Sequence, residues 1–217
     1  MTGVSDLEDR FYLEPAAAFV RATLRAEAMD LPQPAAVQLG LERGLRLHRF
    51  KRSTELPRVK RVLGLLRGLG PTSLLDVGTG RGVFLWPLLT SFPTLDVTAI
   101  DNDGKRATQL AAVADGVRRL TTQRMDVTAM SFEDGAFDVV TVLEVLEHLP
   151  NPERGAAEAL RVASRAVIVS VPSHEDDNPH HLHLLDARRL EALLKAAGAR
   201  RVTIDGVRGH LVAMAMR

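Results

Sequence analysis

The residues with the clearest chemistry form the segment Asp76-Val77-Gly78-Thr79-Gly80-Arg81-Gly82. An apolar run precedes the three glycines and an apolar helical pattern follows them, so we expect a strand, a tight loop and a helix. Glycine at every second position lets the backbone turn sharply and lets a ligand lie against the main chain. Dinucleotide sites use G-x-G-x-x-G and hold a diphosphate at the helix N-terminus. Asp76 would repel a diphosphate, so the loop favours a ligand that carries a cation.

A second acidic position follows the next predicted strand, 96–100. Asp101 lies 25 positions beyond Asp76, and Asn102 adjoins it. An acid at this strand end can accept hydrogen bonds from both hydroxyls of a ribose, as in dinucleotide folds. The same residues could instead cap the helix that follows, and the two roles are compatible. We therefore predict that Asp101 and Asn102 bind a nucleoside.

A third group of polar residues, Glu144, Glu147 and His148, follows the predicted strand 137–142. If this segment turns helically, the three side chains converge on one face, because they are spaced i, i+3 and i+4. The segment 174–183 holds four of the seven histidines and follows the next predicted strand. Two carboxylates and two imidazoles could hold Mg²⁺, Mn²⁺ or a similar ion. The alternative is a histidine that only caps or bridges the domain.

The elements that position these residues alternate between strand and helix. We expect strands at 74–77, 96–100, within 123–127, and at 137–142, 166–171, 202–204 and 211–216, with helices at 83–91, 105–113, 152–162 and 186–197. Such alternation predicts an α/β fold with a doubly wound, mostly parallel, seven-stranded Rossmann-like sheet and helices on both faces. Ligands bind such sheets at the carboxyl ends of the strands, where the polar residues above are found.

Residues 1–70 are expected to be an N-terminal helical extension that packs on the domain formed by 71–217. Helical patterns cover 6–30, 35–50 and 57–67. Residues 43–67 contain nine Arg or Lys side chains and one acid, Glu55. This segment is either a phosphate-binding face for RNA or a phosphorylated substrate, or a solvated helix face whose basic stems cover apolar surface.

Composition excludes several classes of protein. The 28 basic and 27 acidic side chains give a formal net charge of +1, which argues against a dedicated polyelectrolyte binder. The chain has no cysteine, so it has neither disulfides nor thiolate metal sites. It shows no signal-peptide pattern and no apolar run of membrane-spanning length. We expect a cytoplasmic protein without a membrane partner.

The glycine loop resembles motif I of the class I S-adenosylmethionine-dependent methyltransferases. The segment 143–152, Leu-Glu-Val-Leu-Glu-His-Leu-Pro-Asn-Pro, resembles the same family, and the motifs occur in the family's order over about residues 72–172. The resemblance implies that S-adenosylmethionine binds across residues 76–144. It also implies that Asp126 faces the adenine amino group and that the apolar Val127 helps to hold the ring. Leu143 and Glu144 would complete the cofactor site.

Two kinds of methyl acceptor are consistent with this resemblance. The spacing of Glu144, Glu147 and His148, with His181 as the distant ligand, is similar to that of metal-assisted small-RNA 2′-O-methyltransferases. The same segment is widespread in small-molecule methyltransferases, and aromatic residues are only 4% of the chain, which is few for stacking RNA bases. We favour a small-molecule acceptor, with His148 or His181 as the base where one is needed. A non-catalytic cofactor-binding protein and a nicotinamide oxidoreductase are the rival functions.

Overall fold

A central sheet of seven strands organises the molecule. A computed structural model describes residues 4–52, 56–174 and 178–217. The strands are β1 (Ser73–Val77), β2 (Asp96–Asp101), β3 (Leu120–Arg124), β4 (Phe137–Leu143), β5 (Ala163–Pro172), β6 (Arg201–Val207) and β7 (His210–Met216). Their order across the sheet is β3-β2-β1-β4-β5-β7-β6. Strands β1 to β5 pair in parallel, and β7 is antiparallel to both β5 and β6. The predicted mostly parallel, doubly wound sheet is confirmed.

Helices cover both faces of the sheet because its central strands are buried on both sides. Neighbouring residues in β1 show this: Leu74 belongs to one apolar core and Leu75 to the other. The first core includes side chains of α4 (Pro57–Leu69), α5 (Leu85–Ser91) and α6 (Gly104–Ala114). The second core includes side chains of α7 (Pro152–Val162) and α8 (Ala187–Ala196). The elements after each strand are thereby fixed against the sheet.

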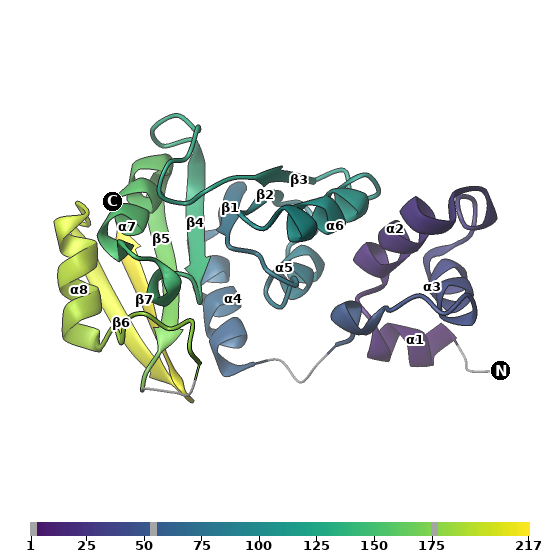
Figure 1. Ribbon diagram of the computed structural model, residues 1–217, viewed down its shortest axis with the longest axis horizontal. Coiled ribbons are helices and arrows are strands. Elements are labelled where there is room, and N and C mark those ends of the chain that lie inside the picture. Colours follow the sequence, from purple (N-terminus) through teal and green to yellow (C-terminus); the bar gives the residue numbers. More distant parts are fainter. Residues whose placement is uncertain (1–3, 53–55, 175–177) are drawn as a thin grey trace.

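The N-terminal helices form a separate group beside α5 and α6 (Figure 1). They are α1 (Val4–Arg10), α2 (Leu13–Leu24), the 3-10 turn η1 (Arg25–Glu27), α3 (Gln33–Glu42) and the 3-10 turn η2 (His48–Phe50). The ring of Phe50 lies 5.2 Å from that of Trp86 in α5. Arg119, just before β3, donates two hydrogen bonds of 2.7 and 2.6 Å to the Glu14 carboxylate. The expected packing of this group on the core is therefore observed.

Helix α4 contacts β6 and β7, so it belongs to the layer that covers the sheet. Helices α1 to α3 lie apart from the strands in Figure 1. The division of the chain at residue 70 stays a prediction, and α4 is the part of the predicted extension that contacts the sheet.

Several predicted helix boundaries are wrong for local reasons. The helix expected over 6–30 is interrupted at Phe11, which forms a bridge with Lys51 and so leaves the helical path. The helix expected over 35–50 ends at Glu42, just before Gly44 with its φ of 73°. The helix expected over 83–91 begins at Leu85, so Pro87 lies in its first turn and introduces no kink.

Strand boundaries also differ from the prediction. Strand β3 ends at Arg124, earlier than the predicted 123–127, and the last two strands are each seven residues long instead of short pieces. Strands β6 and β7 pair along their whole length, which extends both of them. Cross-strand pairing of this kind is not visible in the local sequence pattern.

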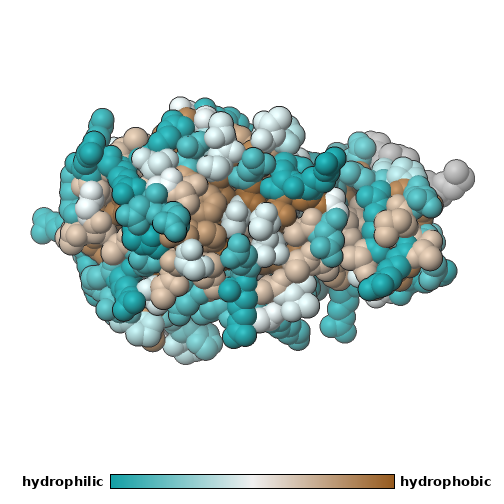
Figure 2. Space-filling model, turned by 90° about the horizontal axis from the view of Figure 1, so that it is seen from above, coloured by the Kyte–Doolittle hydropathy of each residue, from teal (hydrophilic) through white to brown (hydrophobic). Residues whose placement is uncertain are grey.

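Most of the surface seen in Figure 2 is polar, and apolar side chains gather toward the middle of that face. Among the described residues, no helix is long and apolar enough to span a bilayer. The predicted cytoplasmic location stays a prediction.

Candidate cofactor and acceptor site

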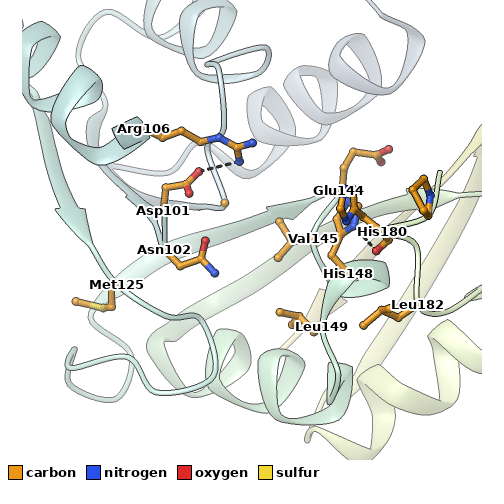
Figure 3. A pocket seen from close by; sticks show the side chains of 12 residues that line it. Asp101, Asn102, Arg106, Met125, Glu144, Val145, His148, Leu149, His180 and Leu182 are labelled. Carbon is orange, nitrogen blue, oxygen red and sulfur yellow. Dashed lines mark hydrogen bonds and ion pairs between the residues drawn. The ribbon is translucent and has the colours of Figure 1, made fainter. Parts of the chain in front are cut away.

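A cleft of about 560 Å³ lies at the carboxyl ends of the parallel strands. Its lining comes from the segments that follow β1, β2, β3, β4 and β5. The lining residues are Gly78, Asp101, Asn102, Arg106, Met125, Glu144, Val145, His148, Leu149, Pro179, His180 and Leu182. Figure 3 shows Asp101 and Asn102 on one side of this cleft and His148, His180 and Leu182 on the other. The structure thus has a cleft where the sequence places the ligand, and the binding itself stays a prediction.

A smaller recess of about 210 Å³ adjoins the cleft at the glycine loop. Gly78, Arg106 and Glu144 line both spaces, so the two form one elongated site. The other residues that line the recess are Arg58, Val59, Asp76, Thr79, Gly80, Arg81, Val83, Phe84 and Leu143. An elongated site of this kind suits a ligand with two chemically different ends.

The glycine loop presents its backbone to the site. Gly80 has a φ of 60°, and an added Cβ would meet only the Gly78 carbonyl oxygen, at 3.8 Å, so the space above it is open. Gly82 has a φ of 83° and does not line either space. An added Cβ at Gly82 would overlap the ring of Trp86. Gly82 therefore permits close packing of Trp86, and its contact with the cofactor stays a prediction.

Asp76 is only 2% exposed at the bottom of the recess. The Thr79 hydroxyl donates to Asp76 Oδ2 at 2.8 Å, and the Thr141 hydroxyl donates to Asp76 Oδ1 at 2.9 Å. Burial raises the pKa of Asp76 to about 6, although these two hydrogen bonds oppose the shift. A cation bound in the recess would favour the ionised form of Asp76. The recess should therefore bind a cation more tightly once Asp76 has lost its proton.

Asp101 is 3% exposed, and its carboxylate fixes the loops around it. The Gly80 N–H donates to Asp101 Oδ2 at 2.8 Å, and the Asp103 N–H donates to Asp101 Oδ1 at 2.9 Å. Arg106 lies 3.8 Å from Oδ2 (Figure 3). The side chain that caps α6 is Asp103, which accepts from the N–H groups of the first turn. Asp101 therefore does not cap this helix and faces the cleft beside the exposed Asn102.

Asp126 and Val127 are not among the residues that line the cleft, and their contact with the adenine ring stays a prediction. The exposed Asp126 carboxylate accepts from the N–H and hydroxyl of Thr128, at 2.7 and 2.8 Å. Val127 is buried in the core under α7. The neighbouring Met125 lines the cleft instead, because the chain leaves β3 at Arg124, earlier than the sequence pattern suggested.

Glu144 occupies the junction between the cleft and the recess. Its φ of 58° is a left-handed conformation, unusual for a residue other than glycine. The Ser170 hydroxyl donates to Glu144 Oε1 at 2.7 Å, and His210 Nε2 lies 3.0 Å from Oε2. Arg58 Nε lies 3.8 Å from Oε1. These contacts hold the carboxylate at the point where the two parts of the site meet.

The convergence predicted for Glu144, Glu147 and His148 is only partly correct. The helical turn η3 spans Leu146–His148, and the left-handed Glu144 precedes it and points elsewhere. Ligand atoms of Glu147, His148 and His181 lie within 4.8 Å of one another. The structure thus brings together three of the four proposed metal ligands and separates Glu144 from them.

The histidine segment is attached to η3 by backbone contacts. The N–H groups of Leu182 and His183 donate to the Glu147 carbonyl oxygen at 2.8 and 3.2 Å. His148 Nδ1 lies 2.8 Å from the carbonyl oxygen of His180. A carbonyl oxygen only accepts, so Nδ1 carries the proton in the neutral ring and Nε2 is left able to accept one. His148 therefore has the tautomer that a general base needs.

Three of the nine cations in the basic segment 43–67 lie near acids of different elements. Arg43 pairs with Glu27, Arg61 pairs with Asp205 in β6, and Arg58 approaches Glu144. These three contacts give no support to a continuous phosphate-binding face, and the role of the segment stays a prediction.

Among the side chains of the site that sequence reasoning missed are two that lie next to Glu144. Arg58 was one of nine basic residues in a segment without a distinguishing pattern, although its helical spacing from the buried Val59, Val62 and Leu66 could have shown that it faces the sheet edge. His210 is a lone histidine in the final strand, and no local signal connects it to Glu144. It reaches the site because β7 pairs with β5, opposite Pro172.

The strand order, the antiparallel β7 and the glycine loop after β1 are typical of the class I, Rossmann-like S-adenosylmethionine-dependent methyltransferase fold. In comparison with known proteins, residues 75–170 match the family described as “Methyltransferase domain”. The match covers 96 of the 217 residues, so it shows that this part of the chain is similar to that family.

The similar proteins described next share less than 30% of their residues with this chain. A malonyl-[acyl-carrier protein] O-methyltransferase of Geobacter sulfurreducens is 28% identical over 181 residues, which are 67% of this chain and 63% of that protein. The chain thus spans less than two thirds of the length of this curated relative. The structure of a SAM-dependent methyltransferase from Aquifex aeolicus has a TM-score of 0.62 at 22% identity, covering 75% of this chain and 90% of that one. Magnesium protoporphyrin IX methyltransferase from Synechocystis PCC 6803, with bound SAH, has a TM-score of 0.59 at 18% identity, covering 73% and 81%.

Proposed function

We propose that this protein binds S-adenosylmethionine and transfers its methyl group to a small-molecule acceptor. The observation that carries the proposal is the elongated site itself, with Asp101 at one end, Asp76 at the other and the glycine backbone between them. The match to the methyltransferase family and the SAH in a structural neighbour support the same cofactor. The similarity to the malonyl-[acyl-carrier protein] O-methyltransferase supports methyl transfer to an organic acceptor.

The adenosine part fits the larger cleft. Asp101 can accept from the ribose hydroxyls, since each carboxylate oxygen has a further lone pair besides the one used by a backbone N–H. Met125, Val145 and Leu149 offer apolar contacts to the adenine ring. Asp126 is not needed for this arrangement.

The methionine part fits the recess at the glycine loop. Arg58 is a guanidinium of this recess that can pair with the methionine carboxylate, and Asp76 is an acid of the same recess that can attract the ammonium group. Leu143 and Glu144 line the same recess. This placement directs the sulfonium toward the junction at Glu144, where the acceptor can approach from the histidine side of the cleft.

The reaction is an in-line displacement in which the acceptor atom forms a bond to the methyl carbon as the bond from carbon to sulfur breaks. The sulfonium becomes a neutral thioether, so alignment of the two reactants supplies much of the catalysis. An acceptor hydroxyl must also lose its proton. His148 Nε2, or His181 in the same cluster, is placed to take it.

Mg²⁺ fits the observed side chains poorly. Mg²⁺ prefers about six oxygen ligands, whereas the cluster offers one carboxylate and two imidazoles once Glu144 points elsewhere. We therefore assign no step to a metal. The RNA acceptor considered from the sequence also lacks support, because the basic side chains are dispersed and the named relatives above give no indication of RNA.

Calorimetric titration with S-adenosylmethionine and S-adenosylhomocysteine tests the proposal, first alone and then with chelator. We expect micromolar binding of both compounds that is unaffected by chelation. Absence of binding would overturn the proposal. Binding followed by no methyl consumption across a broad panel of small molecules would instead favour a non-catalytic binding protein on the same fold.

A further inference from the structure

The first half of the glycine loop is held by the end of β2. The N–H groups of Gly78 and Thr79 donate to the Ile100 carbonyl oxygen at 2.9 and 3.2 Å, and the Gly80 N–H donates to Asp101 at 2.8 Å. The loop contains three glycines with positive φ, so its backbone has more conformations to lose on ordering than other segments have. Contacts that order the loop in advance therefore favour the binding of a ligand.

The second half of the loop, Arg81 and Gly82, is held by Trp86 in α5. The indole Nε1 of Trp86 donates to the Arg81 carbonyl oxygen at 3.1 Å, and its backbone N–H donates to the Gly82 carbonyl oxygen at 3.1 Å. The indole ring also lies so close to Gly82 that an added Cβ would overlap it. The position of Trp86 therefore determines the position of this half of the loop.

Trp86 packs in turn against the N-terminal group, which consists of α1 to α3 with η1 and η2 and lies beside α5 in Figure 1. The fully buried Phe50 of η2 has its ring centroid 5.2 Å from that of Trp86, at an angle of 45°. Phe50 is held by α2, because the Phe19 ring lies 5.5 Å away and the Tyr12 N–H donates to the Phe50 carbonyl oxygen at 2.8 Å. A continuous row of contacts thus leads from α2 to the glycine loop.

The N-terminal group lies outside residues 75–170, the part of the chain that matches the methyltransferase family. Neither Phe50 nor Trp86 is among the residues that line the cleft or the recess, and the same holds for every described residue of the N-terminal group. An effect of this group on the cofactor must therefore pass through residues that lie between them. The row from Phe50 through Trp86 to the loop is such a connection.

We propose that Phe50 is a positioning residue for the cofactor: it holds Trp86, and Trp86 holds Arg81 and Gly82 in the conformation that binds S-adenosylmethionine. The N-terminal group thereby contributes to cofactor affinity without touching the cofactor. The inference rests on the proposed function, because it concerns the affinity of that same site for its ligand. A loop that is only partly in its binding conformation has a proportionally higher Kd, so loosening the row of contacts weakens binding.

Calorimetric titration of three variants with S-adenosylhomocysteine tests this proposal, at a temperature well below their thermal transitions. Phe50→Leu keeps most of the apolar volume but removes the ring, and we expect its Kd to rise about three- to tenfold. Trp86→Phe keeps a ring but removes the N–H that binds the Arg81 carbonyl oxygen, and we expect a similar rise. Phe137→Leu is the matched control, because Phe137 forms a ring pair with Phe132, 5.0 Å between centroids, at the start of β4 and thus at the end of the sheet opposite the site. This control should lower the thermal transition and leave the Kd unchanged.

The double variant Phe50→Leu/Trp86→Phe shows whether Phe50 acts through Trp86. Trp86→Phe already weakens the link to the loop, so Phe50→Leu should raise the Kd by a smaller factor in that background than in the unmodified protein. Equal factors in the two backgrounds, an unchanged Kd in Phe50→Leu, or the same rise in Phe137→Leu would each overturn the proposal. Phe19→Leu, which loosens Phe50 from one contact further away, replaces Phe50→Leu if circular dichroism shows that the latter does not fold.

Amide hydrogen exchange over residues 78–86 separates this inference from the proposed function. Without ligand, these amides should exchange faster in Phe50→Leu than in the unmodified protein or in Phe137→Leu, and equal exchange would overturn the inference. Absence of S-adenosylhomocysteine binding to the unmodified protein would contradict the proposed function. The exchange measurement needs no ligand, so it still decides whether Phe50 orders the loop.

Discussion

The substitution Asp76→Asn tests the electrostatics at the centre of the site. Burial raises the pKa of Asp76 from 3.8 to about 6 in the folded protein, whereas the unfolded chain keeps the ordinary value. Between these values the folded state binds a proton that the unfolded state does not. The free energy of unfolding therefore falls as the pH rises through this window, and the group has no further effect above it. Across the whole window, the contribution of Asp76 to the free energy of unfolding changes by about 3 kcal/mol. About 2 kcal/mol of this change falls between pH 4.5 and pH 7.

Urea unfolding at a series of pH values measures this effect, with the fluorescence of Trp86 as the signal. Trp86 is the only tryptophan and is 2% exposed. Asparagine cannot ionise, so the stability of the unmodified protein relative to Asp76→Asn should decrease by about 2 kcal/mol from pH 4.5 to pH 7. Asp138→Asn is the control. Hydrogen bonds from Thr72 lower the pKa of Asp138, so its contribution is lost only at more acidic pH and the difference should be flat across this window. A relative stability of Asp76→Asn that does not change with pH would refute the reasoning.

Four further substitutions test the assignments in the cleft. Gly80→Val should keep the fold by circular dichroism yet abolish S-adenosylhomocysteine binding, and normal affinity would contradict our placement of the loop. Gly82→Ala should lower the free energy of unfolding by about 1–3 kcal/mol, because the new methyl group overlaps Trp86. Asp101→Asn should weaken S-adenosylmethionine and S-adenosylhomocysteine alike, by about 1.5–3 kcal/mol in calorimetry, and an unchanged Kd would leave Asp101 with only its role in holding the loops. His148→Gln should reduce kcat about 10²-fold or more with a hydroxyl acceptor while the Kd of S-adenosylhomocysteine stays the same; an unchanged kcat would assign proton removal to another group.

Local sequence patterns were sufficient for the sheet and the glycine loop. The central strands β1, β4 and β5 are largely apolar runs, and such runs form buried parallel strands almost independently of what precedes them. Boundaries were less predictable where the partner is distant. The chain breaks at Phe11 because it pairs with Lys51, and β6 and β7 lengthen because they pair with each other.

In the candidate site, too, some residues could be placed from their neighbours along the chain and others could not. Asp101 and Gly80 could be placed from their own sequence context, since the end of a parallel strand fixes the direction of the residues beside it. Glu144 could not, because its left-handed backbone turns its side chain away from η3 and toward Ser170 and His210. A helical spacing rule fails when one residue in the pattern leaves helical geometry.

The class of fold, the cation-favouring glycine loop and the acid at the end of β2 could be read from the amino-acid sequence, because they depend on periodicity and on neighbours along the chain. Which charged groups share the site depends on how separate elements pack. Arg58 approaches Glu144 across 86 positions of sequence, and His210 approaches the same carboxylate from β7. Such juxtapositions arise from the packing of separate elements against the sheet, and electrostatic interactions depend on that distance in space and not on distance along the chain.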